Sequence, residues 1–503
     1  MGGRNIVIGV DQGTTNTKVV AVDDSGKMIA EASRPIETRA PQPSWVEQDP
    51  DAMLENVVGC VRDVLDKTGR SAGDATGLGI ANQTETLIVW DRKTGKPVLP
   101  AIVWQCRRGQ EQIESVRNGG NAESIRQRTG LDLDPTFTAP KLKWVCENRP
   151  EIARGLRNGD HLFGTVDCWL IWKLTGGAVY ATEPGNASRT MLLDINTLAW
   201  DPGLRDLFDL SIAEMPQLRR SSGPFGETDA EFFGAPITIS AALGDQQASL
   251  FGHGCFDENQ RKVTYGTGAF VWMNAGKRAD IPAADGLIRT VAWHLDDPCY
   301  ALEGFVMSAG AALDWLADHI GIFAGGPGVV AEAQEAKASD GVYLVPAFQG
   351  LASPWWRPDV RGGLIGMTEA TTSGHICHAG LEAICYQIRT IMDVVAGSLG
   401  HGIEAVSADG GPTKSAYLMQ LQADILQRPV APAIHESVTP YGVALMAGLG
   451  FGLWEDLGHL RRIIPAPAIV RPDPASASRW DDGYGGWRAA TDALLNLYGS
   501  NKL

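Results

Sequence analysis

IVIGVDQGTT, residues 6–15, carries the strongest structural signal in the chain. Its β-branched residues give way at Asp11 to a turn that contains Gly13, Thr14 and Thr15, which predicts a buried strand entering a tight polar turn. Gly13 lets backbone N–H groups approach an anion closely, the threonine hydroxyls add donors, and Asp11 offers a carboxylate to a magnesium ion. The stretch therefore predicts a phosphate-binding turn, and the alternative is an ordinary polar hairpin.

The segment from Lys18 to Val22 is again rich in β-branched residues, so the turn joins two strands as a hairpin. A Walker A loop would need GxxxxGK[ST] between a strand and a helix, and that pattern does not occur in the chain. A second turn of the same design follows in VTYGTGAF, residues 263–270, where a strand-like run breaks at Gly266 and Thr267. Two such turns, one in each half of the chain, predict a duplicated α/β unit with phosphates held between the halves.

The chain is too long for one hydrophobic core. Its 503 residues predict two domains of about 250 residues each, which we place at residues 1–250 and 251–503. With 44% hydrophobic and 20% charged residues, the composition is that of an ordinary globular protein.

The net charge of −16 disfavours nucleic acid and an anionic membrane as partners, because both would be repelled by most of the surface. Eight cysteines occur without a CxxC pair, which is typical of reduced thiols in a cytosolic enzyme. The N-terminus lacks the pattern of a signal peptide, and no apolar window of about 18 residues occurs. We therefore expect a cytoplasmic protein without a membrane partner.

Three polar or aromatic side chains are candidates for a substrate site. Glu85 lies between the strand-like runs 76–81 and 86–90, where a carboxylate can accept a substrate hydroxyl. Trp104 lies in AIVWQCRR, and its indole could pack against the C–H face of a polyol. Asp245 follows an apolar strand in ISAALGDQQASLFG and could act as a general base. A solvated turn, a core tryptophan and a helix N-cap are the respective structural alternatives.

Glycines mark two further positions where a backbone can approach a ligand. Gly310 lies at the expected start of a helix in residues 308–316, and Gly410 and Gly411 follow a strand just before another helix. A plain tight turn is the alternative for the glycine pair. The other expected segments are helices at 50–69, 140–148, 166–174, 372–399 and 486–497, and a surface loop at 463–482.

Taken together, these stretches resemble the FGGY carbohydrate kinases, and among them the glycerol kinases, over nearly the whole chain. The resemblance rests on DQGTT (11–15), WVEQDP (45–50), NQTET (82–86), IVWQCRR (102–108), FGTVDCWLIWKLTGG (163–177), NASRTML (186–192), GDQQASLFG (244–252), TYGTG (264–268) and DGG (409–411). It implies an α/β fold of two actin-like (ribonuclease H-like) ATPase domains that close on ATP and a sugar or polyol. It also implies a homodimer or homotetramer.

The resemblance implies a role for each matching position. Asp245 matches the general base, and with Asp11 it would lie near Mg²⁺. The positions matching ATP contacts are Thr14, Thr15, Asn16, Lys18, Gly266, Thr267, Gly310, Asp314, Gly410, Gly411 and Ser415. The positions matching polyol contacts are Thr84, Glu85, Trp104, Thr136, Asp245, Gln246 and Phe270. Lys18, Asp314 and Ser415 depart from the arginine, glutamine and asparagine usual in glycerol kinases.

Two departures bear on the acceptor. Glycerol kinases read NQRET and DPYF, whereas this chain has Thr84 in place of the arginine and Thr136 in place of the tyrosine. Losing a charged donor to a bound hydroxyl costs about 1.5 to 3 kcal/mol, on the order of 10 to 100-fold in affinity. The vacated volume predicts a polyol somewhat longer than glycerol, such as the four-carbon tetritol erythritol, with glycerol as a competitor.

Two other functions remain as alternatives at this point. One is a pentulose kinase of the xylulose type, and the other is an actin- or chaperone-like ATPase without a small substrate. The glycine-rich loop GGKGG, which binds a sugar bisphosphate in some bacterial glycerol kinases, has no counterpart, because the region reads DAEFFGAPITIS at residues 229–240. Feedback by such a ligand is therefore not expected.

Overall fold

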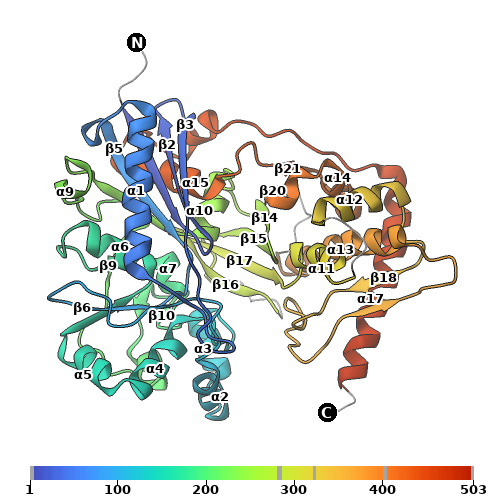
Figure 1. Cartoon of the computed structure of the whole chain (residues 1–503), viewed down its shortest axis with the longest axis horizontal. Helices are drawn as coiled ribbons and strands as arrows, with labels where there is room; N and C mark the ends of the chain where they lie inside the picture. The colour runs from blue at the N-terminus through green and yellow to red at the C-terminus, as the bar shows by residue number, and fades with distance from the viewer. Residues whose placement is uncertain (1–4, 280–285, 321–324, 400–404, 500–503) are drawn as a thin grey trace.

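The computed structural model describes residues 5–279, 286–320, 325–399 and 405–499. Its two largest sheets lie side by side, with helices around and between them (Figure 1). Strands of the first sheet come from the N-terminal half of the chain, and strands of the second come from the C-terminal half.

The first sheet has five strands in the order β13-β5-β1-β2-β3. Its strands are β1 (Ile6–Gln12), β2 (Asn16–Asp23), β3 (Met28–Pro35), β5 (Ala75–Asn82) and β13 (Ile239–Gly244). β1 is antiparallel to β2 and parallel to β5, and β13 is parallel to β5. The hairpin predicted from IVIGVDQGTT is therefore confirmed as β1–β2.

The second sheet has six strands in the order β16-β17-β15-β14-β20-β21. Its strands are β14 (Arg261–Tyr265), β15 (Ala269–Gly276), β16 (Ile288–His294), β17 (Pro298–Val306), β20 (Val406–Gly410) and β21 (Val430–Pro432). β14 is antiparallel to β15 and parallel to β20, which is itself parallel to β21. This arrangement repeats that of the first sheet around the second hairpin, so the predicted duplication of an α/β unit is confirmed.

Helices cover both sheets, and smaller strand pairs extend the first half. The helices are α1 (Pro50–Thr68), α2 (Gln110–Asn118), α3 (Ala122–Thr129), α4 (Thr138–Asn148), α5 (Pro150–Asn158), α6 (Val166–Leu174), α7 (Pro184–Ser188), α8 (Pro202–Leu207), α9 (Ala230–Phe233), α10 (Asp245–Gly252), α11 (Gly310–Asp318), α12 (Gly325–Ala336), α13 (Ser373–Leu399), α14 (Ala416–Leu426), α15 (Val438–Phe451), α16 (Leu457–Ile463) and α17 (Ala477–Gly499). The short strands are β4 (Glu47–Gln48), β6 (Ile88–Asp91), β7 (Ala101–Ile102), β8 (His161–Gly164), β9 (Ala181–Thr182), β10 (Leu193–Asp194), β11 (Ala199–Trp200), β12 (Gln217–Leu218), β18 (Tyr343–Val345) and β19 (Gly363–Ile365).

Helix α1 begins and ends where the sequence predicts. The side chain of Asp49 accepts a hydrogen bond from the N–H of Asp51 at 2.9 Å, and Gly69 ends the helix with a left-handed φ of 62°. Its apolar residues share a core with Ile6 and Ile8 of β1. Figure 1 shows α1 in front of the strands of the first sheet.

The opposite face of the first sheet, which carries Val7, is covered by α10 and α15. Helix α15 approaches β1 so closely that a Cβ on Gly9 would lie only 1.9 Å from the carbonyl oxygen of Pro440. The same core contains Leu243 of the first sheet and Trp272 of the second. The two sheets are thus joined through α10, the helix that begins at Asp245.

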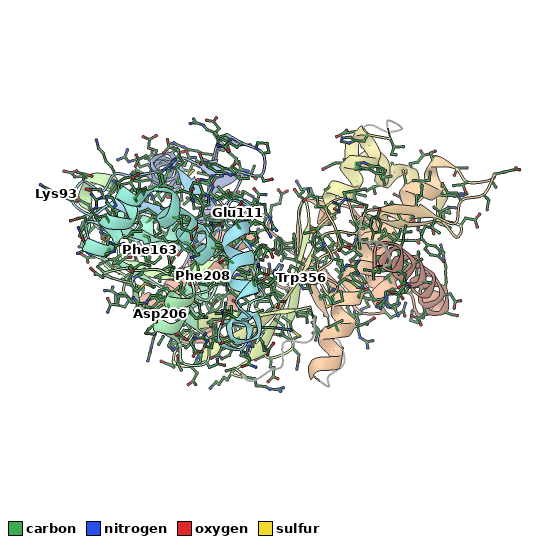
Figure 2. The ribbon with its side chains drawn as sticks, turned by 90° about the horizontal axis from the view of Figure 1, so that it is seen from below. Lys93, Glu111, Phe163, Asp206, Phe208 and Trp356 are labelled. Carbon is green, nitrogen blue, oxygen red and sulfur yellow. The ribbon has the colours of Figure 1, made fainter. Side chains whose placement is uncertain are left out.

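A second contact between the halves lies at the start of β16. Phe163 and Phe208 belong to a core formed by the small helices and strands of the first half, and Ile288 from β16 is buried in that core. Trp356 packs against its edge and donates its indole N–H to the carbonyl of Gly286 at 2.8 Å. Figure 2 shows Phe163 and Phe208 in the first half and Trp356 near the junction with the second.

The last helix is longer than the sequence predicts. We expected a surface loop at 463–482 and a helix from Gly486, but α17 begins at Ala477. Asp473 caps a short 3₁₀ turn by accepting from the N–H of Ala475 at 3.0 Å, and this turn leads directly into the helix. Its buried Trp480 lies in the segment that the Pro/Ala/Ser composition led us to interpret as a loop.

All eight cysteines are free thiols in the structure. Within the described ranges, none of the helices combines the length and the apolar character needed to cross a membrane.

Candidate active site

The turn of the β1–β2 hairpin is fixed by local and distant hydrogen bonds. The N–H of Gly13 donates to the carbonyl of Asn16 at 3.1 Å, which closes the turn. The indole N–H of Trp104 donates to Oγ1 of Thr14 at 2.9 Å, while Thr15 at the tip is exposed. The structure therefore brings one predicted polyol contact, Trp104, directly against a predicted phosphate contact, Thr14.

The β14–β15 hairpin lies against the N-terminus of α11. The carbonyl of Gly266 accepts from the N–H of Gly310 at 3.0 Å, and the carbonyl of Thr267 accepts from Ala309 and Ala311 at 2.9 and 3.0 Å. A Cβ on Gly310 would lie 2.6 Å from the carbonyl oxygen of Gly266, so only glycine allows this approach. Three of the predicted nucleotide contacts are thus neighbours.

The glycine pair after β20 belongs to the same neighbourhood. Gly410 has a φ of 97°, and a Cβ there would lie 1.9 Å from the carbonyl oxygen of Tyr265 in β14. Around Gly411 the space is open. Ser415 instead caps α14, because its Oγ accepts from the N–H of Leu418 at 3.1 Å. Its hydroxyl thus has a structural partner already.

Asp314 lies about one turn of α11 beyond Gly310 and is exposed. Its side chain lines a cavity of about 490 Å³. The rings of Trp315 and Phe348 also line this cavity, with their centroids 4.7 Å apart. The departure at Asp314 therefore places an acidic group at the rim of an aromatic cavity on the C-terminal half.

Glu85 is buried in the loop after β5 with a left-handed φ of 64°. Oγ1 of Thr84 donates to one carboxylate oxygen at 2.7 Å, and Nε of Arg189 donates to the other at 2.6 Å. A glutamate in the left-handed region costs free energy unless its surroundings hold it there, and such residues cluster at functional sites. The two hydrogen bonds thus fix the position of the Glu85 carboxylate.

Sequence reasoning left Arg189 out of the site, although NASRTML is one of the segments that carry the resemblance. Its Nη1 donates to Glu303 of β17 at 2.6 Å, and all three side chains of this group are at most 7% exposed. An arginine within a run of small residues was the available signal, but it does not reveal two distant carboxylate partners.

Lys141 was also missed. It lies on α4, and its Nζ donates to the carbonyl of Glu85 at 3.2 Å and to the carbonyl of Thr136. Thr138 donates to the same Glu85 carbonyl at 3.1 Å. The structure thus places the two departures, Thr84 and Thr136, in loops that one lysine connects.

Asp245 is the first residue of α10, directly after β13. Burial raises its pKa to about 7, and the negative charge of Glu85 acts in the same direction. As a residue, Asp245 is half-buried. A carboxylate with a pKa near neutrality is suited to take a proton from a hydroxyl group.

Asp11 faces a similar environment. Burial raises its pKa to about 8, the charge of Asp245 adds to the rise, and Lys18, its partner across the hairpin, opposes it. Its Oδ1 is buried without a hydrogen-bond partner. Two neighbouring carboxylates, one with an unused oxygen, suit a divalent cation. Nowhere in the described ranges do three or more acidic, histidine or cysteine side chains form a metal site, so phosphate and water would have to supply the other ligands.

The remaining predicted contacts lie on β15 and α10. Nζ of the buried Lys262 donates to Oε1 of Gln246 and to Oγ1 of Thr264, both at 2.6 Å. The ring of Phe270 stacks on Phe305 with centroids 4.6 Å apart and packs against the core that contains the strand before Asp245. Lys262 was not predicted, although a lysine among strand-forming residues could have indicated it.

Helix α10 connects the two candidate sites. Ser249 and His253, one turn apart, both bond to Oδ2 of Asp409, at 2.6 and 2.8 Å. Burial alone would raise the pKa of Asp409, but Lys262 and these two partners hold it below its ordinary value. Helix α10 therefore carries Asp245 at its N-terminus and contacts Asp409, the residue before Gly410, near its C-terminus.

Comparisons with known proteins agree with this geometry. Residues 6–252 match the N-terminal domain of the FGGY family of carbohydrate kinases, and residues 262–451 match its C-terminal domain. The glycerol kinase of Bacillus velezensis is 39% identical over 97% of this chain and 99% of its own length. The glycerol kinase of Limosilactobacillus reuteri is 39% identical over the whole of both chains.

Solved structures show the same architecture. A crystal structure of Plasmodium falciparum glycerol kinase with ADP superposes with a TM-score of 0.90 at 32% identity, over 98% of each chain. A gluconate kinase from Lactobacillus acidophilus reaches a TM-score of 0.89 at 21% identity over 99% of each chain, which shows the fold alone. The predicted fold of two actin-like ATPase domains is confirmed, and the family match favours a carbohydrate kinase over an ATPase without a small substrate. The chain belongs to the FGGY family of carbohydrate kinases and is a phosphotransferase with an alcohol group as acceptor.

Proposed function

We propose that this protein is an ATP-dependent polyol kinase whose acceptor is glycerol or a somewhat longer polyol, such as the C4 tetritol erythritol. The observation that carries the proposal is the position of Asp245. This carboxylate, with a pKa of about 7, acts electrostatically on Asp11 beside the first hairpin and is itself influenced by Glu85 in the polyol loop. Asp245 thus interacts electrostatically with a group expected near the phosphates and with a group expected near the polyol, which supports its proposed role as the general base.

In this proposal Asp245 takes the proton from the attacking hydroxyl while Glu85 accepts a hydrogen bond from a neighbouring hydroxyl. Arg189 and Thr84 hold the Glu85 carboxylate in place. Phosphoryl transfer needs little covalent help from a protein, so these residues act by orienting the acceptor toward the γ-phosphate.

The two hairpins would hold the phosphates. Thr14 and Thr267 offer hydroxyls, and the turns would offer backbone N–H groups other than those of Gly13 and Gly266, which donate within the turns themselves. Asp11 and Asp245 would hold Mg²⁺, which supplies charge neutralisation at the phosphate oxygens when it is bound. The unpartnered Oδ1 of Asp11 supports this assignment.

The proposed length of the acceptor rests on the small side chains of Thr84 and Thr136. The hydroxyl of Thr84 donates a hydrogen bond to Glu85, and the backbone carbonyl of Thr136 accepts one from Lys141. Neither side chain fills the volume of the arginine or tyrosine found in glycerol kinases. A further hydroxymethyl group of the substrate would occupy that volume.

The test is a panel of polyols from three to five carbons with kcat/KM measured for each. The proposal predicts that a C4 tetritol is used at least as well as glycerol. If glycerol exceeds every C4 and C5 polyol by about tenfold, the enlarged pocket is wrong while the kinase assignment stands. Xylulose belongs in the same panel, because preference for it would favour the pentulose alternative.

A further inference from the structure

Lys141 is a buried cation that holds two backbone carbonyls together. Its side chain is fully buried on α4, and its ammonium donates to the carbonyls of Glu85 and Thr136. These carbonyls belong to two loops that are about 50 residues apart in the chain. Without the ammonium between them, the two carbonyl oxygens would repel each other; the Glu85 carbonyl would keep only the hydrogen bond from Thr138, and the Thr136 carbonyl would lose the donor that joins it to the other loop.

The surroundings of Lys141 disfavour its charged form, mainly because the ammonium is buried. Burial lowers the pKa of Lys141 to about 7, whereas Glu85, Cys106 and Asp134 raise it and Arg108 lowers it. The ammonium is bound by carbonyl dipoles instead of a direct carboxylate contact. Burying an ammonium costs free energy, because the charge loses its hydration. A buried lysine at this position is therefore consistent with a functional role in fixing the shape of the two loops.

We propose that Lys141 is a positioning residue that sets the separation between the Glu85 and Thr136 loops and thereby the length of polyol that the enzyme accepts. This inference rests on the proposed function, because it assumes that both loops contact the acceptor. Glu85 would contribute the carboxylate that receives one hydroxyl, and Thr136 the wall that limits the far end. The hydrogen bonds from Lys141 to these loops go to their backbone carbonyls.

Lys143 provides a matched control on the same helix. Its ammonium is also largely buried, but it pairs with Asp209 at 2.6 Å and with Glu147 at 3.1 Å, and not with either polyol loop. Replacing either lysine by methionine removes one buried cation from α4. Only the change at Lys141 removes the ammonium that the two loop carbonyls share, although Thr138 would still donate to the carbonyl of Glu85.

The experiment compares Lys141→Met and Lys143→Met with the unmodified enzyme, using glycerol, erythritol and a C5 polyol as acceptors. We expect Lys141→Met to change the ratio of kcat/KM between C4 and C3 acceptors by about tenfold or more, with KM for ATP changed less than about twofold. Lys143→Met should leave the ratio unchanged. A merely structural role of Lys141 would lower kcat/KM for every acceptor by one common factor.

The outcomes separate the inference from the function on which it rests. If the unmodified enzyme phosphorylates no polyol, the proposed function fails. If it does so and Lys141→Met keeps the same C4 to C3 ratio, the inference fails. Should Lys141→Met not fold, Lys141→Gln also removes the positive charge between the two carbonyls, and an unchanged C4 to C3 ratio in that variant overturns the inference in the same way.

Discussion

The guanidinium of Arg189 donates to the carboxylate of Glu85 at 2.6 Å, and both side chains are buried. The same guanidinium bonds to Glu303 on the second sheet. One arginine therefore fixes the acidic group expected to bind the acceptor and ties it to the other half of the molecule.

Replacing Arg189 by leucine should destabilise the protein by about 3 to 5 kcal/mol, because two buried carboxylates lose their countercharge. Thermal unfolding measures this loss. Arg220→Leu is the control, since its pair with Asp296 is exposed and such pairs contribute about 0 to 1 kcal/mol. Equal effects of the two changes would contradict the role given to Arg189.

Activity should depend on pH through Asp245. Its pKa of about 7 means that the carboxylate is protonated, and unable to act as a base, below that pH. We expect kcat/KM for the polyol to rise as pH increases from about 6 to 8. Since Mg²⁺ would favour the ionised carboxylates, raising its concentration should move this rise to lower pH. A rate that is flat over this interval would exclude Asp245 as the titrating base.

The stability of the metal-free protein should fall as pH rises from about 4 to about 8. The pKa values of Asp11 and Asp245 are raised on folding, so the folded state binds more protons than the unfolded state between pH about 4 and 8. The stability they contribute is complete below pH about 4 and is lost as pH rises through about 8. Asp11→Asn should therefore raise the melting temperature at pH 8 while it weakens Mg²⁺-dependent turnover. A lower melting temperature for this variant would contradict the assignment.

The glycine pair after β20 allows a matched test of the second hairpin. Gly410→Ala should cost about 1 to 3 kcal/mol, because the φ of 97° is strained for alanine and the new Cβ would meet the Tyr265 carbonyl. At Gly411 a Cβ meets open space, so Gly411→Ala should leave the melting temperature nearly unchanged. Denaturant unfolding of both variants checks the difference, and similar losses would show that the close approach is unimportant.

Much of the fold could be predicted from local sequence. The β-branched runs around Gly13 and Gly266 specify two hairpins, and Asp49 and Gly69 specify the ends of α1, because each signal depends on neighbouring residues. The start of α17 at Ala477 could not be predicted in this way, since its tryptophans are stabilised by burial against distant elements.

The candidate site was predictable where residues follow strands or glycine turns, as for Asp245 and Glu85. Arg189 was not, because its partners lie 104 and 114 residues away and only the folded chain brings them together. Lys141 was not predicted either, because its partners are backbone carbonyls, which leave no signature in the sequence.

The most direct test of the account is polyol-dependent release of ADP by the unmodified enzyme and by Asp245→Asn, with ATP binding measured on both. We predict that the unmodified enzyme releases ADP in response to glycerol or a C4 polyol. Asp245→Asn should bind ATP as before and lose at least about 99% of this turnover, since a general base contributes about 10² to 10⁴-fold. Unchanged turnover in Asp245→Asn would contradict the central claim that this carboxylate activates the acceptor.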